Sequence, residues 1–305
     1  MSAEGLKGNS TFSEFHPVVN LTYYVLAIGL TMFSMSPWFL GVTFALAWVY
    51  SVLLKGTPVI RTNLILLFWI VLVMALINVI FVHDGETVLF YLRGNAVTAE
   101  ALIYGISAAV MLGSVVIWFT SFNVIMTAEK LIYLFGRAAP VMGLTLSMIF
   151  RYIPLLRQRY REVAMGQQCL WAPEENGKKP PLLRRLRRTG KNVSILISWS
   201  LESSIESADS MEARGYGLRG RTSFHLYRFD RRDVIAEAWL IALGTICAVG
   251  WAMKKTEVWF YPSYQMHPFD WLTAVTLAAF AALLATPVVV DIAGERKWKR
   301  SDVTI

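Results

Sequence analysis

The chain has 305 residues, of which 55% are hydrophobic and only 16% are charged. Soluble domains average about 25% charged residues, so this composition disfavours a disordered chain, a disulfide scaffold and an ordinary cytosolic enzyme. A net charge of +8 could suggest a nucleic-acid partner, so the location of the basic residues along the chain matters. Residues 151–232 hold 17 basic and 8 acidic residues (17 − 8 = +9), and the rest of the chain holds 12 and 13 (12 − 13 = −1).

Long uncharged windows lie on both sides of this basic central block. No Asp, Glu, Lys or Arg occurs between Glu14 and Lys55, which leaves room for two membrane spans divided at Ser36-Pro37. One such window could be a buried core helix of a soluble protein, but several predict a membrane protein. We expect six spans, at residues 18–35, 37–54, 63–82, 101–120, 234–253 and 271–290.

The distribution of Lys and Arg predicts how the spans are oriented. Cytoplasmic loops carry an excess of these residues, so the central block and the basic tail Glu295–Arg300 belong in the cytoplasm. Both termini then lie inside as well. Lys254 and Lys255 fall outside in this arrangement, against the trend. The N-terminal segment lacks the pattern of a cleavable signal, so we expect the first span to remain.

The central block is too long for a simple loop. Ala138–Phe150 is apolar but short for a span, which predicts a helix packed against the bundle or lying in the interface. Arg151 and Pro154 mark the predicted start of a second helix, because proline suits a first turn. One face of this helix is predicted to carry Leu156, Tyr160, Val163, Gln167 and Leu170. It should stop near Trp171-Ala172-Pro173.

Residues 173–190 are expected to form a linker that is rich in Pro, Gly, Lys and Arg. Its cluster Arg184-Arg185-Leu186-Arg187-Arg188 is explained by positive-inside charge with anionic-lipid contact. Nucleic acid is a poor alternative because no fold-level motif accompanies the cluster.

Residues 192–215 predict another long cytoplasmic helix. Its apolar stripe has helical spacing, with an acidic stripe beside it, and its serines supply small residues that let helices approach closely. The apolar stripe consists of Ile197, Leu201, Ile205, Ala208 and Met211, and the acidic stripe of Glu202, Glu206, Asp209 and Glu212. The helix should end at Gly215, because glycine adopts the left-handed conformation readily. Arg214 then lies on its last turn. There its positive charge either stabilises the partial negative charge of the helix C-terminus or forms a bidentate hydrogen bond with a carboxylate of a partner.

The segment Met211-Glu212-Ala213-Arg214-Gly215-Tyr216-Gly217 resembles the second Ala-Arg-Gly signature of energy-coupling factor transporter T components. These are the membrane scaffold subunits of vitamin and metal-cation importers. Two weaker similarities occur in the same order: Phe15-His16-Pro17-Val18-Val19-Asn20 resembles the start of many members, and Arg151-Tyr152-Ile153-Pro154 resembles the segment leading into the first coupling helix. The order and spacing of these pieces agree along essentially the whole chain.

The sequence departs from the family pattern at the end of the first coupling helix. Members usually carry a first Ala-Arg-Gly there, whereas this chain has Gln168-Cys169-Leu170-Trp171. An apolar tip thus replaces a cation, which puts a symmetric use of two ATPase grooves in doubt.

The resemblance implies a non-catalytic subunit in the cell membrane of a prokaryote. The expected partners are two ABC ATPases or one fused ATPase, a small substrate-binding membrane subunit (S component) and the lipid membrane. No cofactor, metal or nucleic acid is expected, and no P-loop or zinc-protease motif occurs in the sequence. The chain would import a vitamin or metal cation together with these partners. An ordinary ABC permease or an ion-coupled transporter with its own substrate path is the alternative.

The predicted fold is all-α and polytopic, with about six transmembrane helices and two long cytoplasmic coupling helices. We expect residues 1–120 to contain the first four spans and residues 121–232 to form the coupling region. Residues 233–305 should contain the last two spans and the basic tail.

Overall fold

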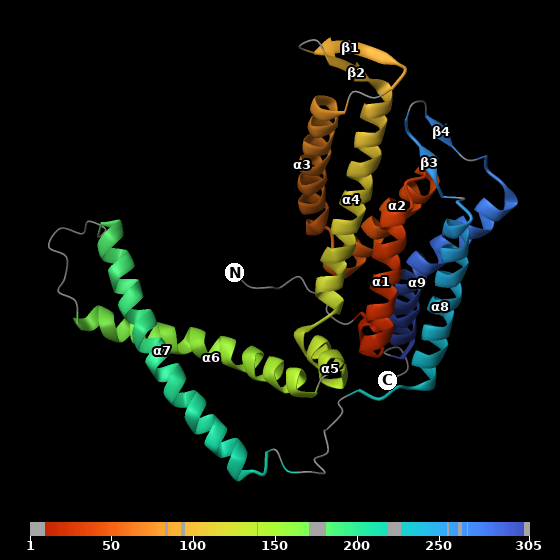
Figure 1. Cartoon of the computed structure of the whole chain (residues 1–305). Helices are drawn as coiled ribbons and strands as arrows, with labels where there is room; N and C mark the ends of the chain where they lie inside the picture. The colour runs from red at the N-terminus through yellow and green to blue at the C-terminus, as the bar shows by residue number, and fades with distance from the viewer. Residues whose placement is uncertain are drawn as a thin grey trace. The chain divides into compact units, whose positions relative to one another are not determined.

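The computed structural model describes residues 10–82, 85–92, 95–138, 140–170, 181–216, 218, 227–254, 256–261, 264–266 and 268–301. The chain divides into two compact units: unit 1 combines Met1–Thr127 with Tyr227–Ile305, and unit 2 is Ala128–Leu226. Figure 1 shows the elements of both units. The predicted all-α, polytopic class is confirmed, with two short hairpins added to the helices.

Unit 1 is a bundle of six helices with hairpins at one end. The helices are α1 (Pro17–Phe33), α2 (Pro37–Lys55), α3 (Pro58–Phe81), α4 (Ala99–Ile125), α8 (Arg231–Ala252) and α9 (Trp271–Ser301). The short 3-10 helix η1 (Thr11–Glu14) precedes α1. Antiparallel hairpins join α3 to α4 and α8 to α9: β1 (Val88–Leu92) with β2 (Asn95–Thr98), and β3 (Val258–Trp259) with β4 (Gln265–Met266).

Five helices of unit 1 are long and apolar enough to cross a membrane, among the residues that the structure describes. They are α2, α3, α4, α8 and α9. The remaining helix, α1, is also apolar but has only 17 residues, about 26 Å at 1.5 Å per residue, slightly less than the ~30 Å hydrocarbon core. The first of the six predicted spans is therefore a short helix, and the other five have the length and composition of spans.

The sequence determines where the first three helices of unit 1 begin. Pro17, Pro37 and Pro58 occupy the first turns of α1, α2 and α3. A proline there has a suitable fixed φ, and the N–H that it lacks would have no partner inside the helix. Successive helices of the bundle reverse direction, so both hairpins lie at one end while α1 begins and α9 finishes at the other (Figure 1).

The core of unit 1 combines aromatic packing with a buried hydrogen-bond chain. Trp118 is fully buried, and its ring lies 5.9 Å from that of Tyr23 and 6.0 Å from that of Tyr50. Its indole Nε1 donates to Thr43 Oγ1 at 3.2 Å, and that hydroxyl lies 3.0 Å from Thr31 Oγ1. A polar group in a membrane protein needs such an internal partner, because no water is present to replace it.

The Phe15–Asn20 segment makes contacts that hold the start of α1 against the start of α8. His16 caps α1: its Nδ1 accepts a hydrogen bond from the backbone N–H of Val18 at 3.3 Å. The backbone N–H of His16 donates to Asp233 Oδ1 at 3.2 Å, in the first turn of α8. The Arg232 guanidinium lies 4.5 Å from the centre of the Phe15 ring. This segment therefore connects the beginnings of α1 and α8.

Helix α3 packs on α4 and, to a lesser degree, on α2. Most of its large apolar side chains remain exposed, including Phe68 and Trp69. A helix with such a surface inside a membrane protein faces lipid or another membrane protein.

Unit 2 contains α5 (Ala128–Ala138), α6 (Pro140–Leu170) and α7 (Leu182–Ala213). Helices α5 and α6 come into backbone contact at two glycines. A Cβ atom added to Gly143 would overlap with the Cα atom of Gly136. Small residues of this kind allow two helices to approach closely.

The predicted helix start at Arg151 and Pro154 is wrong. Both residues lie inside α6, which begins at Pro140 and runs without interruption to Leu170. A proline in a helix interior removes one hydrogen bond and costs about 3 kcal/mol. Contacts with α5 near Gly143 and with α7 at Tyr152 lie before Pro154 on this helix, and further contacts with α7 follow it, so the continuous helix is supported along its length.

The predicted linker at 173–190 is wrong in its second half. Helix α7 begins at Leu182, directly after Pro181, so the arginine cluster forms its first turns. The backbone N–H of Arg184 donates to Pro181 O at 2.9 Å. Leucine and arginine have high helix propensity, which explains this longer helix. Residues 173–180 lie outside the described part of the chain.

Candidate functional site

The two long helices of unit 2 cross in the middle and leave their C-terminal ends outside the crossing (Figure 1). Tyr152 Oη of α6 lies 2.8 Å from Ser207 Oγ of α7. Further along α6, Leu156 and Tyr160 share a shallow groove with Leu196 of α7. The contacts move toward lower residue numbers on α7 as they move toward higher residue numbers on α6, so the two helices run in roughly opposite directions.

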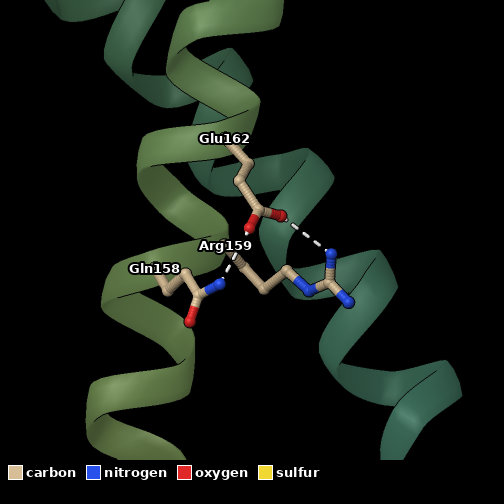
Figure 2. A network of polar contacts seen from close by, with 3 residues as sticks. All are labelled: Gln158, Arg159 and Glu162. Carbon is tan, nitrogen blue, oxygen red and sulfur yellow. Dashed lines mark hydrogen bonds and ion pairs between the residues drawn. The ribbon is translucent and has the colours of Figure 1, made fainter.

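A polar network reinforces this crossing. Figure 2 shows Glu162 accepting hydrogen bonds from Gln158 Nε2 at 3.1 Å and from Arg159 Nη1 at 2.8 Å. These bonds, the one from Arg159 above all, lower the pKa of the Glu162 carboxyl. The Arg159 guanidinium also lies 5.0 Å from the centre of the Trp199 ring, on α7. The network therefore connects the surface of α6 to α7.

The segment Met211–Tyr216 forms a Schellman helix terminator at the end of α7. The backbone N–H of Tyr216 donates to Met211 O at 3.0 Å, and that of Gly215 donates to Glu212 O at 2.9 Å. These two bonds define the motif, and they require a left-handed residue at the position of Gly215. Gly215 has φ 79°, so the glycine satisfies this requirement. The signature thus encodes an abrupt helix end.

Arg214 is the C-cap residue of α7 and is exposed. Its guanidinium extends from the last residue before the chain changes direction. A planar guanidinium in this position can form two parallel hydrogen bonds with one carboxylate. The neighbouring residues Glu212, Ala213 and Tyr216 are exposed as well, and Gly217 lies outside the described residues.

The end of α6 is apolar and exposed. Gln168, Cys169 and Leu170 are all exposed there, Leu170 to 76%. Trp171, the last residue of the predicted degenerate motif, lies outside the described part of the chain. The roles of both helix ends in coupling remain predictions.

The two predicted stripes of α6 and α7 have different surroundings. On α6, Leu156, Tyr160 and Val163 are half-buried. On α7, the half-buried positions toward α6 include Leu196, Trp199, Ser203 and Ser207, and the serines allow close approach. The apolar stripe of α7 is left uncovered: Ile197, Leu201 and Ile205 are 55%, 63% and 65% exposed.

Spacing alone identifies the apolar stripe of α7 but does not show which face of the helix packs on α6. The signal that identifies the packed face is the series of small and aromatic residues from Trp199 to Ser207. The sequence indicates that serines permit close approach, whereas the structure shows that Ser207 is one of those that contact α6.

Two acidic side chains of unit 1 accept hydrogen bonds from the N-terminal part of the chain. Glu237 Oε1 accepts a hydrogen bond from Thr22 Oγ1 at 2.8 Å, and Asp291 Oδ1 accepts one from the backbone N–H of Phe12 at 2.8 Å. No three His, Cys, Asp or Glu side chains come together within the described residues.

These features define a multi-pass, all-α membrane protein with a helical unit whose two long helices end in exposed tips. No family model matches the chain. It is similar to the Energy-coupling factor transporter transmembrane protein EcfT of Lactobacillus helveticus (strain DPC 4571), with 28% identity over 102 residues. The match covers 33% of this chain and 36% of that protein, about a third of each.

Proposed function

We propose that this chain is the transmembrane scaffold, or T component, of an energy-coupling factor importer. It would transmit ATP hydrolysis by two ABC ATPases, or by a fused ATPase, to a small substrate-binding membrane subunit. The transported substrate would be a vitamin or a metal cation. The chain itself would be non-catalytic and would lie in the plasma membrane of a prokaryote, with both termini and unit 2 in the cytoplasm.

Exposed Arg214 at the end of α7 is the observation that carries this proposal. The Schellman terminator fixes the backbone around an exposed cation at the C-cap of the helix. Such a helix end can enter a groove on another protein and bind a carboxylate inside it. The similarity to EcfT over a third of each chain supports the same interpretation.

The uncovered stripe of α7 supports a second partner. Ile197, Leu201 and Ile205 present an exposed apolar strip in the second half of α7, beside its acidic and hydroxyl side chains. Exposed apolar surface of this kind favours an interaction site. We assign the strip to the membrane subunit that binds the substrate, because that partner is itself apolar.

Substitution of Arg214 tests the ATPase interaction. Breaking a buried, hydrogen-bonded charge pair costs about 2–5 kcal/mol, so Arg214→Glu should weaken ATPase binding by roughly 30-fold or more. The measurement is co-purification of ABC ATPases with this chain from cells that produce it, together with substrate uptake. Arg231→Glu is the matched control, because Arg231 is also exposed at a helix end but lies in the first turn of α8. Normal assembly of Arg214→Glu would contradict the proposal.

The apolar tip of α6 leads to a second expectation within this function. A tip without a cation should dock on an apolar surface, so the two ATPase sites should belong to different proteins or to different halves of one chain. Trp171→Ala should then weaken binding of one ATPase and leave the other bound. Identical ATPases, combined with a harmless Trp171→Ala, would count against this asymmetry.

The same purification separates the proposal from its alternative. An ordinary permease or ion-coupled transporter would transport substrate without a separate small membrane subunit. Recovery of the chain with ATPases and such a subunit supports the T-component role, whereas substrate transport by the purified chain alone would exclude it.

A further inference from the structure

The first turns of α7 form a basic amphipathic helix that the coupling function does not use. Arg184, Arg187, Arg188 and Lys191 follow each other at i, i+3, i+4 and i+7 and therefore share one side of the helix. Leu182, Leu186 and Val193 share the opposite side, with Leu183 beside them.

The leucines of this segment are among the most exposed apolar side chains of unit 2. Leu182, Leu183 and Leu186 are 75%, 80% and 60% exposed. The basic side is exposed as well at Arg184, Arg187 and Lys191. A helix that presents leucines on one side and arginines on the other lies favourably at the boundary of a lipid bilayer.

The charge of the segment is unfavourable for the isolated helix. A helix N-terminus carries partial positive charge, and α7 has no acidic residue in its first turn. No acidic residue occurs from Leu182 to Leu201, whereas the last turns contain Glu202, Glu206, Asp209 and Glu212. An anionic partner outside the helix would therefore stabilise this end.

We propose that residues 182–193 bind the anionic phospholipid surface of the membrane that this chain spans. The leucines would enter the headgroup region and the arginines would contact lipid phosphates. Lipid is the partner that matches both sides of the segment, and the five spanning helices of unit 1 keep a membrane attached to the chain. The proposal does not depend on the T-component role, because any membrane protein with this helix would make the same contact.

A fluorescent label on the segment tests the proposal with the full chain in nanodiscs. We would place an environment-sensitive dye at Leu183→Cys in a Cys169→Ser, Cys247→Ala background and add brominated lipids as quenchers. The nanodiscs would contain phosphatidylcholine alone or with roughly a third of phosphatidylglycerol. No ATPase is present, so a failure of the coupling proposal would not affect the result.

We expect a blue shift and strong quenching in the anionic nanodiscs, and less of both in phosphatidylcholine alone. Replacing Arg184 and Arg187 by Gln should reduce the anionic-lipid effect by about fivefold for each charge. The matched control is the dye at Ser210→Cys, on the exposed acidic end of the same helix, which should not respond to phosphatidylglycerol.

Equal quenching in both lipid mixtures, or none in either, would overturn the proposal. Protection of the dye at Leu183→Cys that appears only after the ATPases are added would also overturn it, because the segment would then bind a protein. Elution as a single species in size-exclusion chromatography shows that the variants remain folded.

Discussion

Gly215 is the residue on which the shape of the α7 tip depends. Its φ of 79° is unfavourable for any residue with a Cβ atom, by about 1–2 kcal/mol. Gly215→Ala should therefore weaken the Schellman terminator and misdirect Arg214, although the guanidinium itself is unchanged. ATPase co-purification should fall while the protein remains folded.

A second glycine provides the control for this prediction. Gly166 lies inside α6, and a Cβ atom added to it would meet open space. Gly166→Ala should leave assembly unchanged and stabilise the helix by about 0.5–1 kcal/mol. If Gly215→Ala assembles as well as Gly166→Ala, the left-handed turn is not required for docking.

At the scale of elements, the α5–α6 contact should be sensitive to a single methyl group. Gly143→Ala would overlap with the Gly136 backbone, which no rotamer change can relieve. We expect the variant to lose about 1–3 kcal/mol, the range observed for overpacked sites. Thermal unfolding in detergent, with Gly166→Ala as the reference, measures this loss. Equal melting temperatures for the two variants would show that the helices are further apart.

The crossing of α6 and α7 should show measurable coupling between Arg159 and Trp199. The guanidinium–ring contact is partly exposed, so we expect a coupling energy of about 0.5–1 kcal/mol. The measurement is a double-mutant cycle with Arg159→Ala and Trp199→Ala in chemical unfolding. Glu162→Gln keeps both side chains of the ring contact and removes only the carboxylate charge that Arg159 binds, so it separates the contribution of this ion pair from that of the ring. Additive single substitutions would mean that the contact is not formed.

At the scale of the whole molecule, the two cysteines allow the sidedness of the chain to be tested. Cys169 is exposed at the end of α6, whereas Cys247 is buried, so the native chain already carries one accessible thiol. A membrane-impermeant maleimide should label Cys169 only after the cells are opened, because unit 2 is expected in the cytoplasm. Tyr91→Cys on the β1–β2 hairpin, in a Cys169→Ser background, should be labelled in intact cells. The reverse pattern would invert the proposed topology.

The charge pattern of the sequence was sufficient to predict the membrane helices, because the cost of placing charge in lipid leaves a strong signal. Uncharged windows and first-turn prolines, such as Pro37 and Pro58, mark where α2 and α3 lie. The helix end at Gly215 was also predictable, since glycine adopts that backbone conformation with little strain. These features depend on a residue and its immediate neighbours alone.

Only the tertiary structure decided how the helices of unit 2 extend and pack. Pro154 has the local signature of a helix start, yet contacts with α5 and α7 keep α6 continuous through it. Spacing identifies the apolar stripe of α7, but the structure shows that the serine-rich side packs on α6 and that Leu201 stays exposed. The periodicity of a sequence indicates which residues share one face of a helix. Which other element packs on that face depends on parts of the chain that are distant in sequence.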